Sequence, residues 1–459
     1  MLSKEDNELL CRVGPGTPMG NMFREYWLPA IRSDELPAPD CPPLRVRLLG
    51  ENLIGYRTTS GTAGLMQDAC PHRGASMFFG RNEEEGLRCV YHGWKFDVTG
   101  ACVDMPSEPA ESNFKNKVRA RAYPTYERGG IIWAYMGPRE VPPPLPHMEA
   151  NILNTDPEHI SVLHRKCNWM QGLEGELDTI HAAFLHWGAD RAEDQAPKSF
   201  LYYHFKHRAE AHFVAKDTDF GAAYGAYRPA EEDTFYWRIG YVFFPFYAMQ
   251  AQGEMGPDCK MNAYVPLDDE HTLQWEIFIR TEGTEPRPQR KVPINRTSEP
   301  IPTGRGGSGG GHYVPQTTDW LGRFNLVQNL ENDYLVDREA QSTWKSYSGI
   351  PGIRQQDMAV TETMGPIYNR SREHLGTSDS LIIRTRRNWI KAALAHRDQG
   401  ILPPGVDNPQ MYRIRSGEVI LPRSVDWWEG STSLREKFSA EADRLLEAAA
   451  PLEVPASGS

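Results

Sequence analysis

The sequence has few cysteines and no long apolar run. Seven cysteines occur among 459 residues, and so sparse and odd a set predicts free thiols in a reducing compartment. No apolar stretch reaches the roughly 20 residues that a bilayer-spanning helix needs. The N-terminal "MLSKEDNELL" is charged and lacks the apolar core of a signal peptide. We therefore expect a cytoplasmic protein with no membrane partner.

Runs of basic residues are also missing. The chain has 50 Lys and Arg against 61 Asp and Glu, which gives a net charge of −11. Phosphate binding depends on clustered cations, so nucleic acid is not an expected partner. A literal G-x-G-x-x-G occurs within "GRGGSGGG" at 304–311, but it follows no predicted strand and opens no predicted helix. The sequence therefore predicts no flavin or nicotinamide site of its own.

The secondary-structure signals change along the chain. Residues 44–140 contain short β-branched and aromatic runs bounded by glycine, as strands do. The alternating 271–280 predicts a half-buried strand, and 377–400 predicts a helix that ends at Gly400. The length predicts two or three domains, and the proline cluster at 138–146 predicts a boundary. We predict an α+β fold in three parts: a helical segment 1–40, a β-rich domain 41–145, and a domain 146–459 with a flexible loop at 283–318.

Two short loops each contain one cysteine and one histidine. "CPHRG" holds Cys70 and His72, and "CVYHGW" holds Cys89 and His92. Four Cys and His residues usually indicate structural zinc, but zinc fingers pair like residues at C-x₂₋₄-C and H-x₃₋₅-H. Mixed pairs suit a [2Fe–2S] cluster with two Cys on one iron and two His on the other, the Rieske arrangement.

A second histidine pair follows in "CNWMQGLEGELDTIHAAFLHWG" at 167–188. His181 and His186 could both point inward from a predicted helix at 173–187, provided that the helix bends or ends near His186. Two histidines and one distant carboxylate form the facial triad of non-haem Fe(II) oxygenases. The alternative is an ordinary histidine pair without a metal.

The third ligand of such a triad would come from downstream. The acidic stretch "LVQNLENDYLVDREAQ" at 326–341 offers four carboxylates: Glu331, Asp333, Asp337 and Glu339. A solvated acidic helix face is the alternative interpretation, and spacing alone does not choose between Asp333 and Asp337.

The 70–94 and 167–188 stretches resemble the oxygenase component of Rieske non-haem iron aromatic oxygenases. Together with "GIPGIRQQDMAVTETMGPIYNRSREHLGTSD" at 349–379, they are similar to the phthalate dioxygenase-like branch, which includes aryl O-demethylases. Respiratory Rieske proteins have an extra cysteine in each loop, where this chain has Ala75 and Tyr91. The resemblance implies a Rieske domain and a catalytic domain with an antiparallel, helix-covered sheet of helix-grip type.

The resemblance also assigns roles to residues. Cys70, His72, Cys89 and His92 would bind a [2Fe–2S] cluster. His181 and His186 would bind mononuclear Fe(II), and the branch favours Asp333 as the third ligand, with Asp337 in reserve. Asp178 would connect His181 to His92 of a neighbouring subunit without binding either metal.

The implied activity is that of a terminal oxygenase. A separate NAD(P)H reductase or ferredoxin would supply electrons, and the protein would form a homotrimer or hexamer. The expected substrates are O₂ and an aromatic carboxylate, oxidised by O-demethylation of a methoxy group or by ring monohydroxylation. Glu174 stands where ring-dihydroxylating relatives often carry an asparagine near the iron, which argues against a cis-diol product.

Three alternatives complete the sequence interpretation. The first is a cis-dihydroxylating dioxygenase. The second is a Rieske protein that only transfers electrons, which the 167–188 stretch and the length disfavour. The third is a protein stapled by zinc. Arginines of the 283–318 loop, namely Arg287, Arg290, Arg296 and Arg305, could pair with a substrate carboxylate, but a solvated loop is the favoured interpretation because charged loops are common.

Overall fold

The short β-branched and aromatic runs of the first third form three small antiparallel sheets. The computed structural model describes residues 2–281 and 312–449. Three of the runs expected as strands within 44–140, namely "LRVRLLG", "NLIGYRTT" and "GGIIWAYMG", are present as β2, β3 and β11. One sheet has the order β1 (Trp27–Arg32), β11 (Ile131–Tyr135), β10 (Thr125–Arg128). The second has the order β2 (Leu44–Leu48), β3 (Glu51–Arg57), β4 (Ala63–Gln67), β9 (Ala122–Tyr123).

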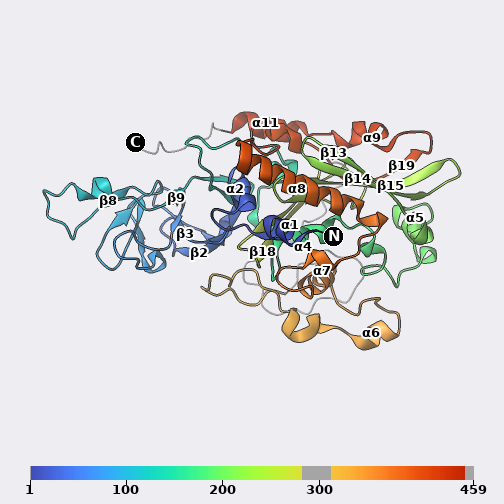
Figure 1. Ribbon diagram of the computed structural model, residues 1–459, viewed down its shortest axis with the longest axis horizontal. Coiled ribbons are helices and arrows are strands. Elements are labelled where there is room, and N and C mark those ends of the chain that lie inside the picture. The colour runs from blue at the N-terminus through green and yellow to red at the C-terminus, as the bar shows by residue number, and fades with distance from the viewer. Residues whose placement is uncertain (1, 282–311, 450–459) are drawn as a thin grey trace.

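The third small sheet lies at one end of the elongated molecule, where Figure 1 shows β8 far from the helices α4 and α7. Its order is β5 (Arg81–Glu83), β6 (Gly86–Arg88), β7 (Lys95–Phe96), β8 (Cys102–Asp104). A hydrophobic core of its own lies beneath these strands, separate from the main core, and includes Ile54, Met66, Leu87, Trp94 and Phe96. Both Cys70 and Cys89 belong to this smaller core.

One large antiparallel sheet organises the rest of the chain. Its eight strands follow the order β12 (Ser161–Arg165), β18 (Thr272–Arg280), β17 (Asp258–Pro266), β16 (Tyr247–Met249), β15 (Thr234–Phe243), β14 (Gly221–Pro229), β13 (His212–Thr218), and β19 (Gly417–Pro422) also pairs with β15. The predicted strand at 271–280 is therefore confirmed. Strand β17 is buried along its whole length, so the main core lies against the centre of this sheet.

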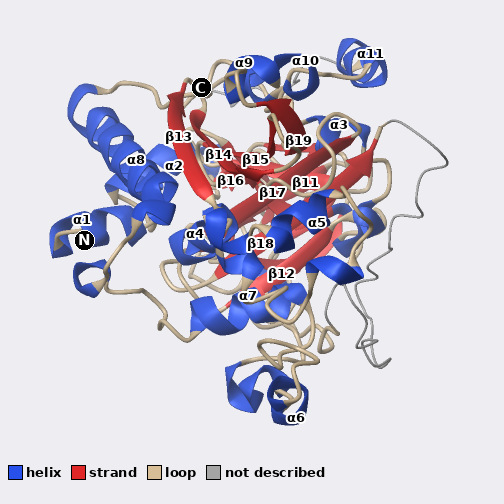
Figure 2. Cartoon of the chain, turned by 90° about the vertical axis from the view of Figure 1, so that its right-hand side faces the viewer, coloured by secondary structure: helices blue, strands red, loops and turns tan. Residues whose placement is uncertain are grey.

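Helices cover the large sheet, and Figure 2 shows α4, α5 and α7 in front of its strands. The predicted helix at 377–400 is α8, which ends as expected at Gly400, where a φ of +66° suits glycine. The helices are α1 (Lys4–Cys11), α2 (Pro18–Arg24), α3 (Glu149–Leu153), α4 (Trp169–Leu177), α5 (Phe200–Lys206), α6 (Arg338–Ser342), α7 (Ile353–Glu362), α8 (Ser380–Gln399), α9 (Trp427–Gly430), α10 (Thr432–Arg435) and α11 (Ala440–Ala448).

The N-terminal segment joins both halves of the molecule. Helices α1 and α2 contact α8, while β1 pairs with β11. A second junction is the β17–β18 turn, where Asp268 accepts hydrogen bonds from Arg47 Nε of β2 at 2.6 Å and from His271 Nδ1 at 2.9 Å. The division at residues 40 and 145 stays a prediction.

Two expectations concern residues that the structure does not describe. Most of the predicted loop at 283–318, with its four arginines and the glycine-rich run, lies within 282–311, outside the described residues. Among the helices that are described, none combines the length and apolarity needed to cross a membrane.

Candidate metal centres

The two Cys–His loops fold into the same turn. In each, the cysteine N–H donates to the carbonyl oxygen five residues on, and the N–H four residues on donates back to the cysteine carbonyl, with N···O distances of 2.8–3.0 Å. The residue four positions after each cysteine has a positive φ, +77° at Gly74 and +79° at Gly93. Glycine adopts this conformation at little cost, which explains why both loops place it there.

The turns put the cysteines inside and the histidines at the surface. Cys70 and Cys89 are buried, whereas His72 and His92 are half-buried with ring centroids 4.3 Å apart. The His72 ring stacks on Trp94 at 4.3 Å and 13°, and its Nδ1 is a buried atom without a hydrogen-bond partner. Buried polar atoms are normally paired, so this nitrogen suits a metal ligand.

The spacing of these four residues separates the two interpretations of the motif. Zinc bonds of 2.0–2.3 Å in a tetrahedron would place ligand atoms about 3.3–3.8 Å apart. Within residues 2–281 and 312–449, the only Cys, His, Asp and Glu that bring three ligand atoms within 4.8 Å of one another are His181, His186 and Asp357. The Cys–His loops therefore do not converge on one point. They fit a cluster of two irons, with the cysteines on one and the histidines on the other.

The second histidine pair does not lie on one helix. Helix α4 ends at Leu177, and His181 begins a separate 3₁₀ turn, His181–Ala183. The predicted helix at 173–187 is therefore wrong in its second half. The cause is Asp178, whose Oδ1 accepts from the backbone N–H groups of Ile180 at 2.9 Å and His181 at 3.3 Å. Such a side-chain-to-backbone turn competes with helix formation and directs the chain away from the α4 axis.

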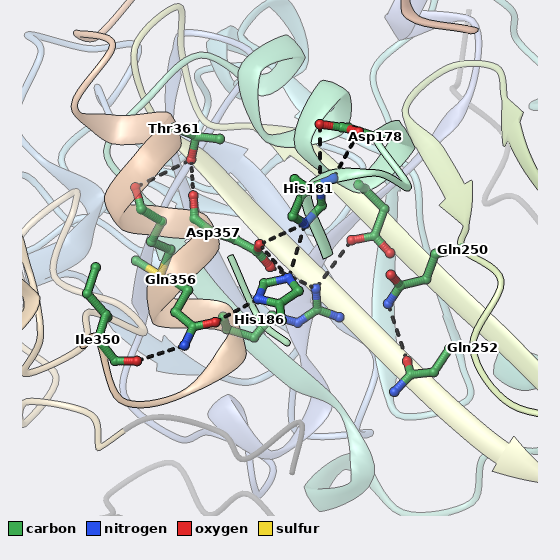
Figure 3. A network of polar contacts seen from close by, with 12 residues as sticks. Asp178, His181, His186, Gln250, Gln252, Ile350, Gln356, Asp357 and Thr361 are labelled. Carbon is green, nitrogen blue, oxygen red and sulfur yellow. Dashed lines mark hydrogen bonds and ion pairs between the residues drawn. The ribbon is translucent and has the colours of Figure 1, made fainter. Parts of the chain in front are cut away.

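Three atoms of metal-binding type converge where this turn meets α7, as Figure 3 shows. The Nε2 atoms of His181 and His186 lie 3.1 Å apart, and Asp357 Oδ1 lies 3.4 and 3.2 Å from them. Ligands at about 2.1 Å and right angles would be about 3.0 Å apart, so these distances suit one metal ion. The set of two histidines and one carboxylate is the donor set of non-haem Fe(II) sites.

The electrostatics of this cluster also favour a cation. Burial lowers the pKa of His181, but Asp178 and Asp357 more than compensate and raise it to about 10. The Asp178 Oδ2 atom lies 3.6 Å from His181 Nδ1, on the ring edge opposite the cluster. The pKa of Asp357 is well below its usual range because contacts with His181 and His186 outweigh its burial. The cluster thus attracts at least one positive charge.

The carboxylate predicted for this cluster lies elsewhere. Asp333 is exposed, in a 3₁₀ segment where its φ is +49°, and it does not belong to the three-residue cluster. Asp337 is also exposed and caps α6 by accepting from the Ala340 N–H at 2.8 Å. The structure brings Asp357 to the histidines instead. The acidic stretch at 326–341 contributes turns and a helix cap, which a local excess of acidic residues does not distinguish from metal binding.

Glu174 does not face the cluster either. Its carboxylate accepts from Arg370 Nη2 at 2.9 Å and from Arg386 Nε at 2.5 Å, and Arg386 in turn pairs with Glu373. The residue is one turn before the helix end and contributes to a buried ion-pair network between α4 and α8. The argument against a cis-diol product that rested on Glu174 therefore loses its basis.

A cavity that is open to solvent adjoins the His–His–Asp cluster. Its wall includes Asp178 and all three cluster residues, with Trp187, Tyr224, Ala182 and Ile353 as apolar parts. Arg354 lies in the wall three residues before Asp357, and its Nη1 is 3.6 Å from Asp357 Oδ2. Arg354 also pairs with Glu176 and Glu276, so its charge is balanced within the wall.

The opposite wall is polar and is held by buried cations. Gln250 and Gln252 line the cavity, and Gln250 Nε2 donates to Gln252 Oε1 at 3.3 Å. Lys260 Nζ donates to the carbonyl oxygens of both glutamines, and Arg238 Nη2 donates to the carbonyl of Ala251 at 2.6 Å. Arg238 itself lines the cavity. Three successive carbonyls are thus fixed, which holds the backbone that carries both amides.

Comparison with known proteins agrees with both centres. Residues 26–124 match the model of the Rieske [2Fe-2S] domain, and residues 314–448 match the model described as LigXa C-terminal domain like. The oxygenase subunit of 3-chlorobenzoate-3,4-dioxygenase from Comamonas testosteroni is 44% identical, over 93% of this chain and 97% of that one. This chain belongs to the Rieske non-haem iron oxygenases, as an oxygenase component.

Other relatives define the branch. The phthalate 4,5-dioxygenase oxygenase subunit of Pseudomonas putida is 35% identical, over 93% of this chain and 94% of its own. The 5,5'-dehydrodivanillate O-demethylase oxygenase subunit of a Sphingobium species is 33% identical, over 85% of this chain and 80% of its own. The structure of dicamba monooxygenase bound to dicamba has the same fold, with a TM-score of 0.52 and 17% identity over 83% of this chain and 100% of that chain.

Family membership confirms the predicted α+β fold, the enzyme class and the cofactors. The chain is a Rieske oxygenase with a [2Fe–2S] cluster and a mononuclear iron, in the phthalate dioxygenase-like branch. The interpretations as a zinc-stapled protein and as a pure electron carrier are thereby excluded.

Proposed function

We propose that this oxygenase component oxidises an aromatic carboxylate, by O-demethylation of a methoxy group or by ring hydroxylation. The observation that carries the proposal is the convergence of His181 Nε2, His186 Nε2 and Asp357 Oδ1 in the wall of a cavity whose opposite side is polar. Such a cavity can hold a ring near the metal while its acidic group faces away from it. Three of the relatives described above are named for aromatic acids.

The metal ligands follow from the donor sets. We assign Cys70, Cys89, His72 and His92 to the [2Fe–2S] cluster, and His181, His186 and Asp357 to Fe(II). When bound and reduced, the mononuclear iron supplies the activation of O₂ that ring or methoxy oxidation needs. Because the ligands occupy one side of the metal, substrate and O₂ can reach the other side from the cavity.

Asp178 is suited to connect the two centres. Its carboxylate is partly exposed, it contacts His181 Nδ1, and it lines the cavity. Within one chain β8, at the outer end of the [2Fe–2S] domain, lies far from α4 (Figure 1). We therefore propose that Asp178 meets the partly exposed His92 of a neighbouring copy, in a cytoplasmic homotrimer or hexamer. Electrons would enter from a separate reductase or ferredoxin.

The polar wall is where the acidic group of the substrate would bind. The amides of Gln250 and Gln252 can donate to a carboxylate, and the adjacent guanidinium of Arg238 lies 3.7 Å from the buried Glu418, with which it shares its charge. Lys260 and Arg238 fix the backbone below these amides, so little ordering would be needed on binding. The apolar wall formed by Trp187, with Tyr224, would contact the ring.

Ring dioxygenation is the second candidate reaction. Two observations favour it: the relatives that are 44% and 35% identical are named dioxygenases, and Glu174 lies in an ion-pair network rather than in the cavity. Both reactions use the same metal ligands and differ in how the ring lies against them.

Single-turnover chemistry tests the proposal. The purified protein is reduced chemically and mixed with O₂ and a panel of benzoates, phthalates and methoxybenzoates, each paired with its methyl ester. Formaldehyde and a product lighter by CH₂ would establish O-demethylation, one added oxygen would establish monohydroxylation, and two added oxygens with two hydrogens would establish a cis-diol. Equal turnover of acids and esters would contradict a carboxylate-binding wall.

A further inference from the structure

Gln356 connects the His–His–Asp cluster to the chain segment that precedes α7. Its Oε1 lies 2.7 Å from His186 Nδ1, and its Nε2 donates to the carbonyl oxygen of Ile350 at 2.8 Å, as Figure 3 shows. The side chain is 7% exposed, so water does not compete strongly for either bond. The residue directly precedes Asp357 in α7.

The Ile350 carbonyl fixes which way the amide points. Turning the amide over would place its oxygen against another carbonyl oxygen, two acceptors with no hydrogen between them. The amide oxygen must therefore face His186, and Nδ1 must carry the hydrogen. A neutral imidazole has only one N–H, so Nε2 is left with a free lone pair. That lone pair points at His181 Nε2 and Asp357 Oδ1.

We infer that Gln356 is a positioning residue that selects the metal-binding tautomer and ring orientation of His186. The inference rests on the proposed function, because it takes His186 as an iron ligand. The two histidines then have different supporting groups: a carboxylate, Asp178, at His181, and a neutral amide at His186. Outer partners of this kind orient the ligand and contribute to metal affinity.

A neutral partner has a specific advantage at this position. Asp357 already supplies a negative charge to the cluster, and Glu176 and Glu276 lie nearby around Arg354. An amide holds the His186 ring without adding a further carboxylate to this buried group. Helix α7 therefore supplies the ligand Asp357, the arginine beside its second oxygen, and the amide that orients His186.

Metal affinity tests the inference without relying on turnover. The mononuclear site is emptied with a chelator while the Rieske absorption is monitored, and Co²⁺ is titrated against a competing chelator, with its visible d–d bands as a second readout. We expect Gln356→Leu to weaken Co²⁺ binding 10- to 100-fold, because outer-partner changes have effects on the order of 10–100-fold. Gln356→Glu keeps an acceptor oxygen for His186 Nδ1 but loses the donor to Ile350 and adds a charge, so we expect a loss of Co²⁺ affinity that is smaller than in Gln356→Leu.

Gln355 provides the matched control. It is a buried glutamine on the same helix, and its amide makes no hydrogen bond within the described residues. Gln355→Leu should leave Co²⁺ affinity and spectrum unchanged. If Gln356→Leu does not fold, as judged by the Rieske absorption, Gln356→Met replaces it because Met retains the chain length without an amide.

The outcomes separate the inference from the proposal beneath it. Wild-type affinity in both Gln356→Leu and Gln356→Met would overturn the inference, as would a loss in Gln356→Glu equal to that in Gln356→Leu. Failure of the proposed function looks different: His186→Ala would then bind Co²⁺ as the wild type does, with the same d–d bands.

Discussion

Asp357→Ala should remove the mononuclear iron while the Rieske cluster stays in place. The variant deletes the atom that lies 3.2–3.4 Å from both histidine Nε2 atoms. Four-ligand structural zinc sites bind with roughly 10–16 kcal/mol, which is about 2.5–4 kcal/mol for each ligand. Loss of one ligand should therefore weaken metal binding by about 100- to 1,000-fold. The fold should survive, because Arg354 keeps its pairs with Glu176 and Glu276.

Iron analysis after dialysis against a mild chelator measures this effect. The wild type should retain the two cluster irons and one further iron per chain, and Asp357→Ala should retain only the cluster irons with unchanged visible absorption. Asp333→Ala is the matched control, an exposed carboxylate of the same chemistry. Retention of all iron and turnover by Asp357→Ala, together with loss of the mononuclear iron by Asp333→Ala, would refute the assignment drawn from the geometry.

Three further predictions concern the connection between the centres, the cluster turn and the domain junction. Asp178→Asn should keep both metals but slow the oxidation of the reduced Rieske cluster by O₂ and substrate at least 10-fold, because outer partners have effects of about that size. Stopped-flow absorption measures this rate. Loss of the mononuclear iron in the variant would instead make Asp178 a ligand. Gly93→Ala would place a Cβ 2.7 Å from a proline side chain at a φ of +79°, so it should lower the Rieske absorption. Gly74→Ala, with a φ of +77° and open space around the Cβ, should reduce the stability of the turn by only about 1 kcal/mol. Equal losses of Rieske absorption in the two variants would contradict this. Burial raises the pKa of Asp268, but the contacts with His271 and Arg47 lower it well below the unfolded value. The stabilisation by Asp268 is therefore present above about pH 4 and is lost as the pH falls further. The free energy of unfolding in urea should fall less steeply with decreasing pH in Asp268→Asn than in the wild type, and an equal slope would contradict this.

The sequence located those parts of the site that depend on local spacing. Cys70 to Gly74 and Cys89 to Gly93 each form one turn, so the residue types within five positions specify the fold of the loop. Asp357 was missed because its approach to His181 depends on how α7 packs against the end of α4, a long-range contact with no periodic signature. Asp333 was preferred because the resemblance to the phthalate dioxygenase-like branch favoured it among the carboxylates of 326–341. The polar run "RQQD" at the start of α7 is buried, but only the structure shows this burial.

The helix boundary at Leu177 shows a second limit. Periodicity extended the predicted helix to 187, whereas one aspartate side chain redirects the backbone. A residue such as Asp178 suits a helix C-terminus or a turn, and the sequence pattern does not say which interaction it chooses. The direction of Glu174 was missed for a related reason, because its partners Arg370 and Arg386 come from a distant part of the chain.

The two walls of the cavity belong to separate structural layers. Asp357 and the groups that hold it are on α7, whereas Gln250, Gln252 and the cations beneath them are on the large sheet and its connecting loops. A substitution in the sheet can change which acid fits without moving a metal ligand, and a change in α7 alters the metal without rebuilding the polar wall. Under the proposed function, substrate range and metal chemistry can therefore be varied independently, and the 250–252 segment is the place to begin changing which acid the enzyme accepts.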